Sequence, residues 1–467
     1  MIIALIIVGG IYIGSLCYCA FKGRQEIRKT KSSFAGAGSG IGSFLGFLTF
    51  SATLFSTFTL MGMPDFFRNH GIGAWIFLGV TDVAMGFIVL AFGLLLKKRV
   101  DAIHFESVSK LLNESYGSKL ASIVYLIGIF IFLLPYVSIQ IRGIAVFLSE
   151  VIPGSLDVWI WAIAIMLAML IYSSIGGLKA IMYSDAVQGI VLLVVTWIVS
   201  IYCLNQLGGV EALIKSVQTS NSELLSTPGP KGLFSFQFLL ASFLTILLMP
   251  ISQPQLTNRI AFLKSGKDLK VMSVAVAIFS LLIILPTIVL GLYGAVKYPS
   301  LGTPEYLGNI LVNEQIAVVG AIAIVGLIAA AMSTADSQLF ALGTELKSNL
   351  NIKQSKQDPV IKLTIVLFAI LAFALALNST NELVLLARVS FAGTALIAPL
   401  VFFAIITKEH LGPEIPLITL LTLVLFLLAN LGLLSSNFLG IRIDLTLLAF
   451  VTIASFSSYI VRRFVNQ

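Results

Sequence analysis

Residues 49–59 read TFSATLFSTFT and interrupt an apolar segment that is otherwise long enough to cross a membrane. Six of these eleven residues are serine or threonine, and Pro64 follows shortly after them. A second interruption, at residues 249–258, reads MPISQPQLTN and carries Pro250 and Pro254. Proline removes a backbone donor and clashes with the preceding helical turn. Both segments are therefore predicted to be broken helices, whose freed backbone groups line a cavity or coordinate a ligand.

The composition of the 467 residues surrounding these breaks indicates an integral membrane protein. Hydrophobic residues make up 58% of the chain and charged residues 11%, whereas about 25% of the residues of an average soluble domain are charged. The mean hydropathy is +1.03. A soluble multidomain protein and a disordered chain are excluded, because the chain has too few polar groups to cover a surface in water. The three cysteines, Cys17, Cys19 and Cys203, lie in apolar runs and do not indicate a disulfide scaffold.

Thirteen apolar segments are long enough, or nearly so, to span a bilayer, for which about 20 residues are needed. Their runs are continuous and not alternating, which favours helices over a β-barrel. The segments are residues 2–21, 40–63, 72–96, 120–147, 158–175, 180–204, 233–251, 271–295, 316–342, 360–377, 383–406, 415–434 and 443–460.

The positions of the basic residues predict the orientation. If the N-terminus is outside, 22 of the 29 lysines and arginines fall in inner connections, and Arg259 is counted among them. This distribution follows the positive-inside rule and predicts a cytoplasmic C-terminus. The net charge of +8 therefore marks the cytoplasmic face and not a nucleic-acid site. The first segment is not a cleaved signal peptide, because its basic cluster lies on the far side.

Two breaks five segments apart are typical of an inverted-repeat transporter. The predicted organisation begins with a peripheral first helix and a cytoplasmic basic loop (1–39). A first five-helix repeat (40–204) and an extracellular loop (205–232) follow. A second five-helix repeat (233–407) and two peripheral helices (408–467) complete the chain.

The charged residues inside the predicted spans that are candidates for chemistry are Asp82, Arg142, Asp185 and Asp336, while Arg388 also lies inside a span. Each costs at least ~2.5 kcal/mol there, so each is a candidate functional residue. Arg142 either snorkels to the outer interface or binds a carboxylate. Asp185 and Asp336 are expected at similar depth. The short distance of Asp185 from Lys179 would also explain its charge by placement at the cytoplasmic interface, whereas no such explanation applies to Asp336.

The ninth segment is predicted to carry a cation site. Ala330, Ser333, Thr334 and Ser337 share one helical face, and Asp336 borders that face. Hydroxyl, carbonyl and carboxylate oxygens are hard ligands that suit an alkali cation. Small residues also line ordinary interfaces between membrane helices. The carboxylate and the unwound helix elsewhere favour the cation site.

Four ordered motifs resemble those of the sodium/solute symporter family, which includes proline, pantothenate and sugar carriers. The motifs are GGLKAIMYSDAVQGIVLL from residue 176, AAAMSTADSQL from residue 329, ATLFSTFTLMGMP from residue 52 and QPQLTNRIAFLKS from residue 253. The resemblance covers nearly the whole chain. It implies an all-α membrane protein with the LeuT-type fold, a five-plus-five inverted repeat with one extra helix ahead of it. Thirteen transmembrane helices are common in that family.

The resemblance also implies ligands. The main sodium site would use carbonyls of Ala52, Phe55 and Ala330 and the hydroxyls of Ser333 and Thr334. A second cation site would use Asp185, Asp336 and Ser337, although the family has a serine or threonine where this chain has Asp336. The expected solute-binding residues lie beside the two breaks and in the neighbouring helices: Ser56, Thr57, Thr59, Asp82, Arg142 and Gln253.

These features predict a sodium-coupled symporter that imports a small organic solute, a carboxylate or an amino acid, through the cell membrane, taken to be a bacterial inner membrane. A proton-coupled symporter using Asp185 and Asp336 is one alternative. A non-transporting membrane sensor is another, although no effector domain follows Gln467. An enzyme is not expected, because the only histidines, His70, His104 and His410, lie in connections and form no catalytic or metal-binding cluster. The expected partners are sodium, the solute and the lipid bilayer, with no nucleic acid.

Overall fold

A computed structural model describes residues 1–30, 40–100, 105–152, 154, 156–350, 357–378, 383–407 and 410–465. Part of the predicted basic loop, residues 31–39, and the positions of His104, Lys353, Lys356 and Lys408 lie outside these ranges. In the described part the chain is almost entirely helical, apart from one short hairpin of β1 (Asn437–Phe438) and β2 (Ile441–Arg442).

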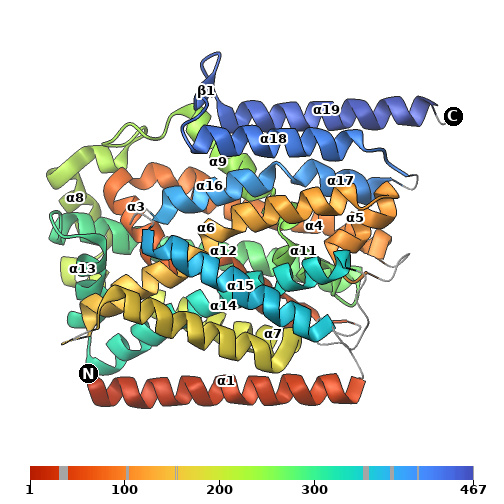
Figure 1. Cartoon of the computed structure of the whole chain (residues 1–467). Coiled ribbons are helices and arrows are strands. Elements are labelled where there is room, and N and C mark those ends of the chain that lie inside the picture. The colour runs from red at the N-terminus through yellow and green to blue at the C-terminus, as the bar shows by residue number, and fades with distance from the viewer. Residues whose placement is uncertain are drawn as a thin grey trace.

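The helices run along one common direction and form an elongated bundle (Figure 1). The α-helices are α1 (Ile2–Thr30), α2 (Ser43–Leu54), α3 (Met63–His70), α4 (Thr81–Val100), α5 (Val108–Tyr116), α6 (Leu120–Val151), α7 (Val158–Leu207), α8 (Val210–Asn221), α9 (Phe236–Leu247), α10 (Met249–Ser252), α11 (Pro254–Ala261), α12 (Gly266–Lys297), α13 (Thr303–Gly308), α14 (Ala317–Asn349), α15 (Gln357–Asn378), α16 (Leu383–Ala395), α17 (Ala398–Ile406), α18 (Glu414–Asn430) and α19 (Ile443–Val465). Short 3₁₀ or π turns are η1 (Phe58–Gly62), η2 (Ile72–Ala74), η3 (Ile76–Val80), η4 (Ser222–Leu225) and η5 (Asn309–Asn313).

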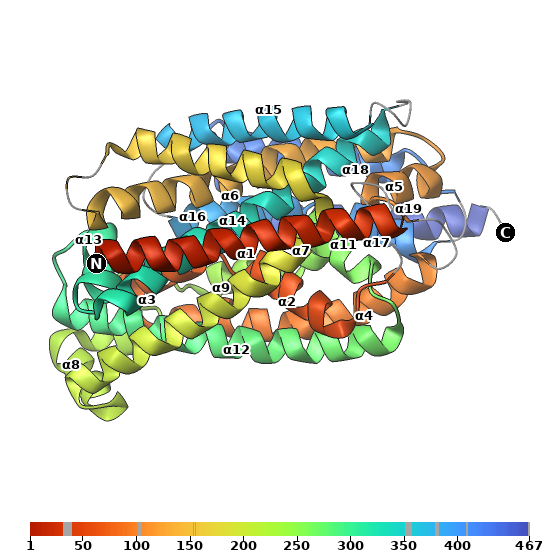
Figure 2. The ribbon, with the colours of Figure 1, turned by 90° about the horizontal axis from the view of Figure 1, so that it is seen from below.

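The two ends of the bundle carry different elements. The end that holds the N-terminus, here called the N-terminal end, also carries α8 and α13, whereas α5 and the C-terminus lie at the opposite, C-terminal end (Figure 1). Helix α1 runs along one side, and α18 and α19 run along the opposite side. Seen from below, α12 and α15 form the two other edges, with α14 between them (Figure 2). The long central helices are therefore enclosed by more peripheral ones.

Nine helices in the described residues are long and apolar enough to cross a membrane, and up to eleven if each of two bent pairs counts as one span. Two shorter apolar helices, Val158–Ile171 and Glu414–Asn430, account for the difference from the thirteen predicted spans. The multi-pass architecture agrees with the sequence, while the number thirteen and the orientation of the termini stay predictions.

The first bent pair is the predicted broken helix at residues 49–59. Helix α2 ends at Leu54, Phe55 adopts an extended conformation (φ −94°, ψ 123°), and the chain continues at 56° to its earlier direction. The side chains of Ser56 and Thr59 replace lost helical partners, because Ser56 Oγ accepts from the Phe58 amide and Thr59 Oγ1 accepts from the Ser56 amide. The hydroxyl-rich sequence thus stabilises the break that it predicts.

The second bent pair is the predicted break at residues 249–258, with a bend of 54°. Gln253 is extended (φ −95°, ψ 117°), as expected for a residue that precedes a proline, and Pro254 starts α11. The backbone angles of Gln253 and Phe55 are nearly the same, in agreement with two related halves of the chain.

The ends of the two broken helices are joined at the C-terminal end of the bundle. The amide of Ile41, just before α2, donates to the carbonyl of Phe262 at 2.9 Å, and the amide of Lys264 donates to the carbonyl of Ile41 at 3.0 Å. Phe262 directly follows α11. The far ends of α2 and α11 are therefore hydrogen-bonded to each other.

The fifth and sixth predicted segments form one helix, α7, with a kink at Gly177. That residue has φ 63° and ψ −170°, a conformation open to glycine because it has no Cβ. The kink positions the second part of α7, which carries Asp185, against α2 and α14.

Candidate sodium and solute site

Helix α14 presents two hydroxyls to the end of α2 at the first break. Ser333 Oγ lies 2.9 Å from the carbonyl oxygen of Ala52, and Thr334 Oγ1 donates to the next carbonyl along α2 at 3.1 Å. Ala330 lies one turn before Ser333, and Phe55 directly follows α2. All five residues are buried. The structure thus places the two helices that carry the predicted main sodium ligands side by side.

The oxygens around Ser333 outnumber the protons available to them. Ser333 Oγ also lies 2.7 Å from Oδ1 of Asp185, yet a hydroxyl has only one proton for this carboxylate and the Ala52 carbonyl. Closely spaced oxygens with unshared lone pairs are the environment that a small, hard cation requires. The geometry therefore fits a sodium ion as a transported substrate.

Asp185 is held by a buried network that includes a guanidinium. Its Oδ2 accepts from Arg259 Nη2 at 2.8 Å and from Thr49 Oγ1 at 2.5 Å. Arg259 also donates to Ser337 Oγ at 2.6 Å, to Thr49 Oγ1 at 2.9 Å and to the carbonyl of Gln255 at 2.6 Å. These bonds join α2, α7, α11 and α14 between the first break and the C-terminal end of the bundle.

The placement of Arg259 corrects the sequence analysis, which counted it in an inner connection. Arg259 is one of the largest fully buried side chains, and it lies on α11, which begins directly after the second break. The reason is that Pro254 restarts a helix instead of ending the segment. Arg259 lies within a turn or two of a predicted break inside the membrane. That position was the signal in the sequence that its side chain is buried.

The predicted second cation site is divided in the structure. Asp185 and Ser337 both bind Arg259, whereas neither carboxylate oxygen of Asp336 has a hydrogen-bond partner in the described part of the chain. Asp336 is nonetheless buried, on α14, a helix that packs against α1 and α7. A second cation stays a proposal. Of the two acids, Asp185 is paired with Arg259, whereas Asp336 has no counter-charge among the described residues.

Two residues of α6 that the sequence analysis missed complete the first break. Tyr136 Oη lies 3.3 Å from Ser56 Oγ, and Gln140 Oε1 accepts from the amide of Thr57 at 3.2 Å. Both side chains are fully buried. Ser56, Thr57 and Thr59 thus lie in one polar cluster with α6, in agreement with a solute-binding role that stays a prediction. A lone tyrosine or glutamine in a long apolar helix gives no periodic signal.

The three remaining predicted solute ligands have different surroundings. Gln253, at the second break, donates to Thr394 Oγ1 on α16 at 3.1 Å. Asp82 is buried near the start of α4. Arg142 is half-buried and donates to the carbonyl of Ala376 near the end of α15 at 2.9 Å. Arg142 thus bonds to α15, and its role in solute binding stays a prediction.

Solved transporter structures share this fold. A Na⁺-coupled sialic acid symporter in a substrate-bound outward-open state superposes with a TM-score of 0.79, covering 97% of each chain at 17% identity. MhsT in complex with L-phenylalanine superposes with a TM-score of 0.58 over 91% of this chain and 99% of that chain, at 15% identity. At these identities the similarity shows the LeuT-like fold alone.

Similar sequences are symporters. A sodium/pantothenate symporter of Haemophilus influenzae is 25% identical over 365 residues, which are 74% of this chain and 73% of that protein. A sodium/proline symporter of Staphylococcus aureus is 26% identical over 426 residues, 85% of this chain and 80% of that protein. These relatives are transporters and not enzymes. The profile of the sodium:solute symporter family matches residues 34–410, most of the chain. The chain therefore belongs to the sodium:solute symporter family.

Proposed function

We propose that this protein uses the sodium gradient to import a small organic solute that carries a carboxylate, such as an amino acid. Family membership supports sodium-coupled symport. The observation that carries the proposal within the structure is the contact of Ser333 and Thr334 with the carbonyl oxygens at the end of α2. Pantothenate and proline, the solutes of the two related symporters, carry a carboxylate, as does the sialic acid of the structurally similar symporter.

The proposed coupling runs through the first break. A sodium ion bound by the carbonyls of Ala52, Phe55 and Ala330 and the hydroxyls of Ser333 and Thr334 would join α2 to α14. That bond would fix the backbone of the break and thereby the positions of the neighbouring hydroxyls and amides that receive the solute. Because only the sodium-bound form presents the solute ligands correctly, each substrate would raise the affinity for the other.

The proposed orientation places the N-terminal end outside the cell, in a bacterial inner membrane. The basic residues at the C-terminal end support it, among them Lys97, Lys98 and Arg99 at the end of α4 and Arg462 and Arg463 at the end of α19. In this orientation the Arg259–Asp185 pair lies on the cytoplasmic side of the sodium ligands. It would close the path to the cytoplasm while the solute enters from outside.

The test is uptake of radiolabelled solutes by proteoliposomes that contain the purified full-length protein. L-Proline, pantothenate, other amino acids and short monocarboxylates are supplied with an inward sodium gradient or with choline in place of sodium. At least one solute is expected to accumulate above its equilibrium level only with the sodium gradient. Accumulation driven by an inward proton gradient without sodium would instead support the proton-coupled alternative.

The matched controls use hydroxyls of one helix. A Ser333→Ala/Thr334→Ala double variant is expected to lose sodium-driven accumulation. Ser348→Ala near the end of α14, where the hydroxyl donates to the carbonyl of Thr344 in the same helix, should keep it. No gradient-driven accumulation of any solute by the wild-type protein would contradict the proposed function.

A further inference from the structure

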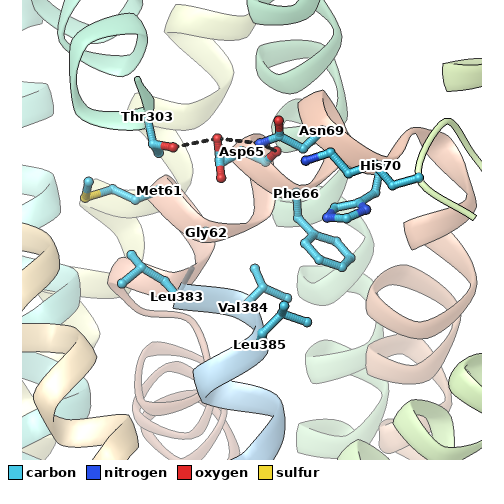
Figure 3. Close-up of a pocket in the computed structure, with 11 residues that line it drawn as sticks. Met61, Gly62, Asp65, Phe66, Asn69, His70, Thr303, Leu383, Val384 and Leu385 are labelled. Carbon is cyan, nitrogen blue, oxygen red and sulfur yellow. Dashed lines mark hydrogen bonds between the residues drawn. The ribbon is translucent and has the colours of Figure 1, made fainter. Parts of the chain in front are cut away.

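A polar pocket lies next to α3 and the start of α13, toward the N-terminal end of the bundle (Figure 1 and Figure 3). It holds about 410 Å³ of empty space, part of it open to solvent. The end of η1, helix α3 and the first turn of α16 form its walls, together with the start of α13 and the loop before α9. The lining residues are Met61, Gly62, Asp65, Phe66, Asn69, His70, Lys231, Thr303, Leu383, Val384 and Leu385.

The walls of this cavity, here called the outer pocket, differ in chemistry. Thr303, Asp65 and Asn69 form a hydrogen-bonded polar row on one side, and Leu383 and its two successors form an apolar row opposite (Figure 3). A small molecule lying between the two rows would have polar groups on one side and hydrocarbon on the other. That asymmetry suits an amphipathic solute and not a bare ion.

The polar side offers both an acceptor and a cation. Thr303 Oγ1 and Asn69 Nδ2 donate to Oδ1 of Asp65 at 2.7 and 3.0 Å, and Arg68 Nη1 lies 3.8 Å from the same atom. These contacts leave Oδ2 for an N–H group of a ligand. Lys231 lines the same pocket, is exposed, and forms no ion pair within the described part of the chain. A carboxylate and an ammonium on one wall match the two charges of a zwitterion.

The outer pocket adjoins the break. Met61 and Gly62 belong to η1, which follows the break residues directly. Phe58, at the start of η1, follows Ser56 in the chain and precedes Met61, and its ring is 6.1 Å from that of Phe391. The Phe391 ring is 4.9 Å from that of Tyr136, the residue beside Ser56. These three rings form a chain of contacts beside the break, here called the aromatic layer.

We propose that the outer pocket binds α-amino acids in their zwitterionic form, before they pass the aromatic layer to the break. The ammonium group bonds Asp65, the carboxylate bonds Lys231, and the side chain lies against Phe66 and Leu383. This site deepens the proposed function by naming a solute class, and it rests on that function for its physiological role. Its binding chemistry does not require sodium, because none of the sodium ligands lines it.

Protection of a cysteine in the pocket from labelling tests this proposal without any need for transport. Cys17, Cys19 and Cys203 are replaced by serine or alanine, and Leu385→Cys is introduced in the full-length protein in nanodiscs. The rate of modification by a charged maleimide is measured in potassium buffer with each standard L-amino acid except cysteine, whose thiol would consume the maleimide. Single-charge analogues serve as matched probes. For L-proline these are pyrrolidine, which keeps only the ammonium, and cyclopentanecarboxylate, which keeps only the carboxylate. For L-leucine they are isoamylamine and 4-methylpentanoate, respectively.

At least one amino acid is expected to slow the labelling in the absence of sodium, whereas its two single-charge analogues at the same concentration do not. Lys231→Gln and Asp65→Asn should each raise the concentration needed for protection by about tenfold or more, because each removes a charge-assisted hydrogen bond. Lys215→Gln and Glu211→Gln, exposed positions on the neighbouring α8, should leave protection unchanged. Lys231 is exposed, so its variant is expected to fold normally.

Failure of this site is distinguishable from failure of the proposed function. Protection that is independent of sodium, together with no sodium-driven uptake of any solute, would refute the symport proposal and leave the pocket standing. Sodium-driven uptake with no protection by any amino acid would overturn the pocket. Equal protection by zwitterion and analogues, or protection that survives Lys231→Gln and Asp65→Asn alike, would overturn it as well.

Discussion

At the scale of single residues, the two hydroxyls on α14 carry the clearest prediction. Ser333→Ala and Thr334→Ala each delete one oxygen ligand while leaving the small side chain that helix packing needs. Each should raise the sodium concentration for half-maximal uptake about fivefold or more, in keeping with ~1 kcal/mol for a lost ligand contact. Kinetics of uptake against sodium concentration measure this, with Ser348→Ala as the control. An unchanged sodium dependence in both variants would remove α14 from the site.

Arg259 makes a second residue-scale prediction, about stability. Removing one partner of a buried ion pair leaves the other charge without compensation, at a cost of about 3 kcal/mol. Arg259→Met should therefore lower the melting temperature markedly, and Asp185→Asn in the same chain should restore part of the loss. Thermal unfolding of the single and double variants in detergent provides the measurement. Additive losses would show that the two side chains do not stabilise each other.

Asp336 makes the third residue-scale prediction, about the ratio of sodium to solute. The Asp336 carboxylate is buried and has no donor among the residues that the structure describes. Such a carboxylate holds a proton or faces a cation, and we propose a second sodium ion at Asp336. The wild-type ratio of sodium to solute should then be near two, and Asp336→Asn should lower it toward one while uptake survives. Parallel measurement of labelled sodium and solute fluxes gives the ratio. A ratio of one in both proteins would leave Asp336 without a cation-binding role.

At the scale of helices, α5 at the C-terminal end depends on one carboxylate of α14. Glu345 accepts from the amides of Val108 and Ser109 at 3.0 and 2.7 Å, and it thus satisfies two of the free N–H groups at the start of α5. Glu345→Ala should destabilise this docking by about 2 kcal/mol, since hydrogen bonds to charged groups are lost. Hydrogen exchange in residues 108–112 should accelerate, whereas Glu114→Ala on the exposed side of α5 should have no such effect.

The helices also show which features of the fold and the site the sequence could predict. Prolines and clustered hydroxyls act locally on the backbone, so both breaks were predictable at Phe55 and Gln253 to within a few residues. The role of Arg259 depends on the direction of α11 after its restart, which no local pattern encodes. The pairing of Ser56 with Tyr136 is likewise a contact between distant helices. The helix that the sequence analysis treated as peripheral, α1, also buries Tyr12 against Gln188 of α7.

At the scale of the whole molecule, the proposed orientation makes a prediction about sidedness. In a cysteine-free background, Lys215→Cys lies on α8 at the N-terminal end and Lys267→Cys lies at the start of α12 near the C-terminal end. A membrane-impermeant maleimide added to intact cells should label the first and not the second. The reverse pattern in cells, with both labelled after lysis, would invert the topology.

The hydrogen-bonded tips of the two broken helices have a mechanical consequence. At ~1.5 Å per residue, the twelve residues of α2 form a lever arm of about 18 Å, and the eight of α11 one of about 12 Å. A rotation of only 10° about Phe55 would displace the tip of α2 by about 3 Å. Because Ile41 is bonded to Phe262 and Lys264, the arm beyond Gln253 is obliged to follow. The hinges at Phe55 and Gln253 are therefore coupled through the hydrogen-bonded ends of α2 and α11. A sodium ion that fixes the bend at Phe55 would also fix the bend at Gln253.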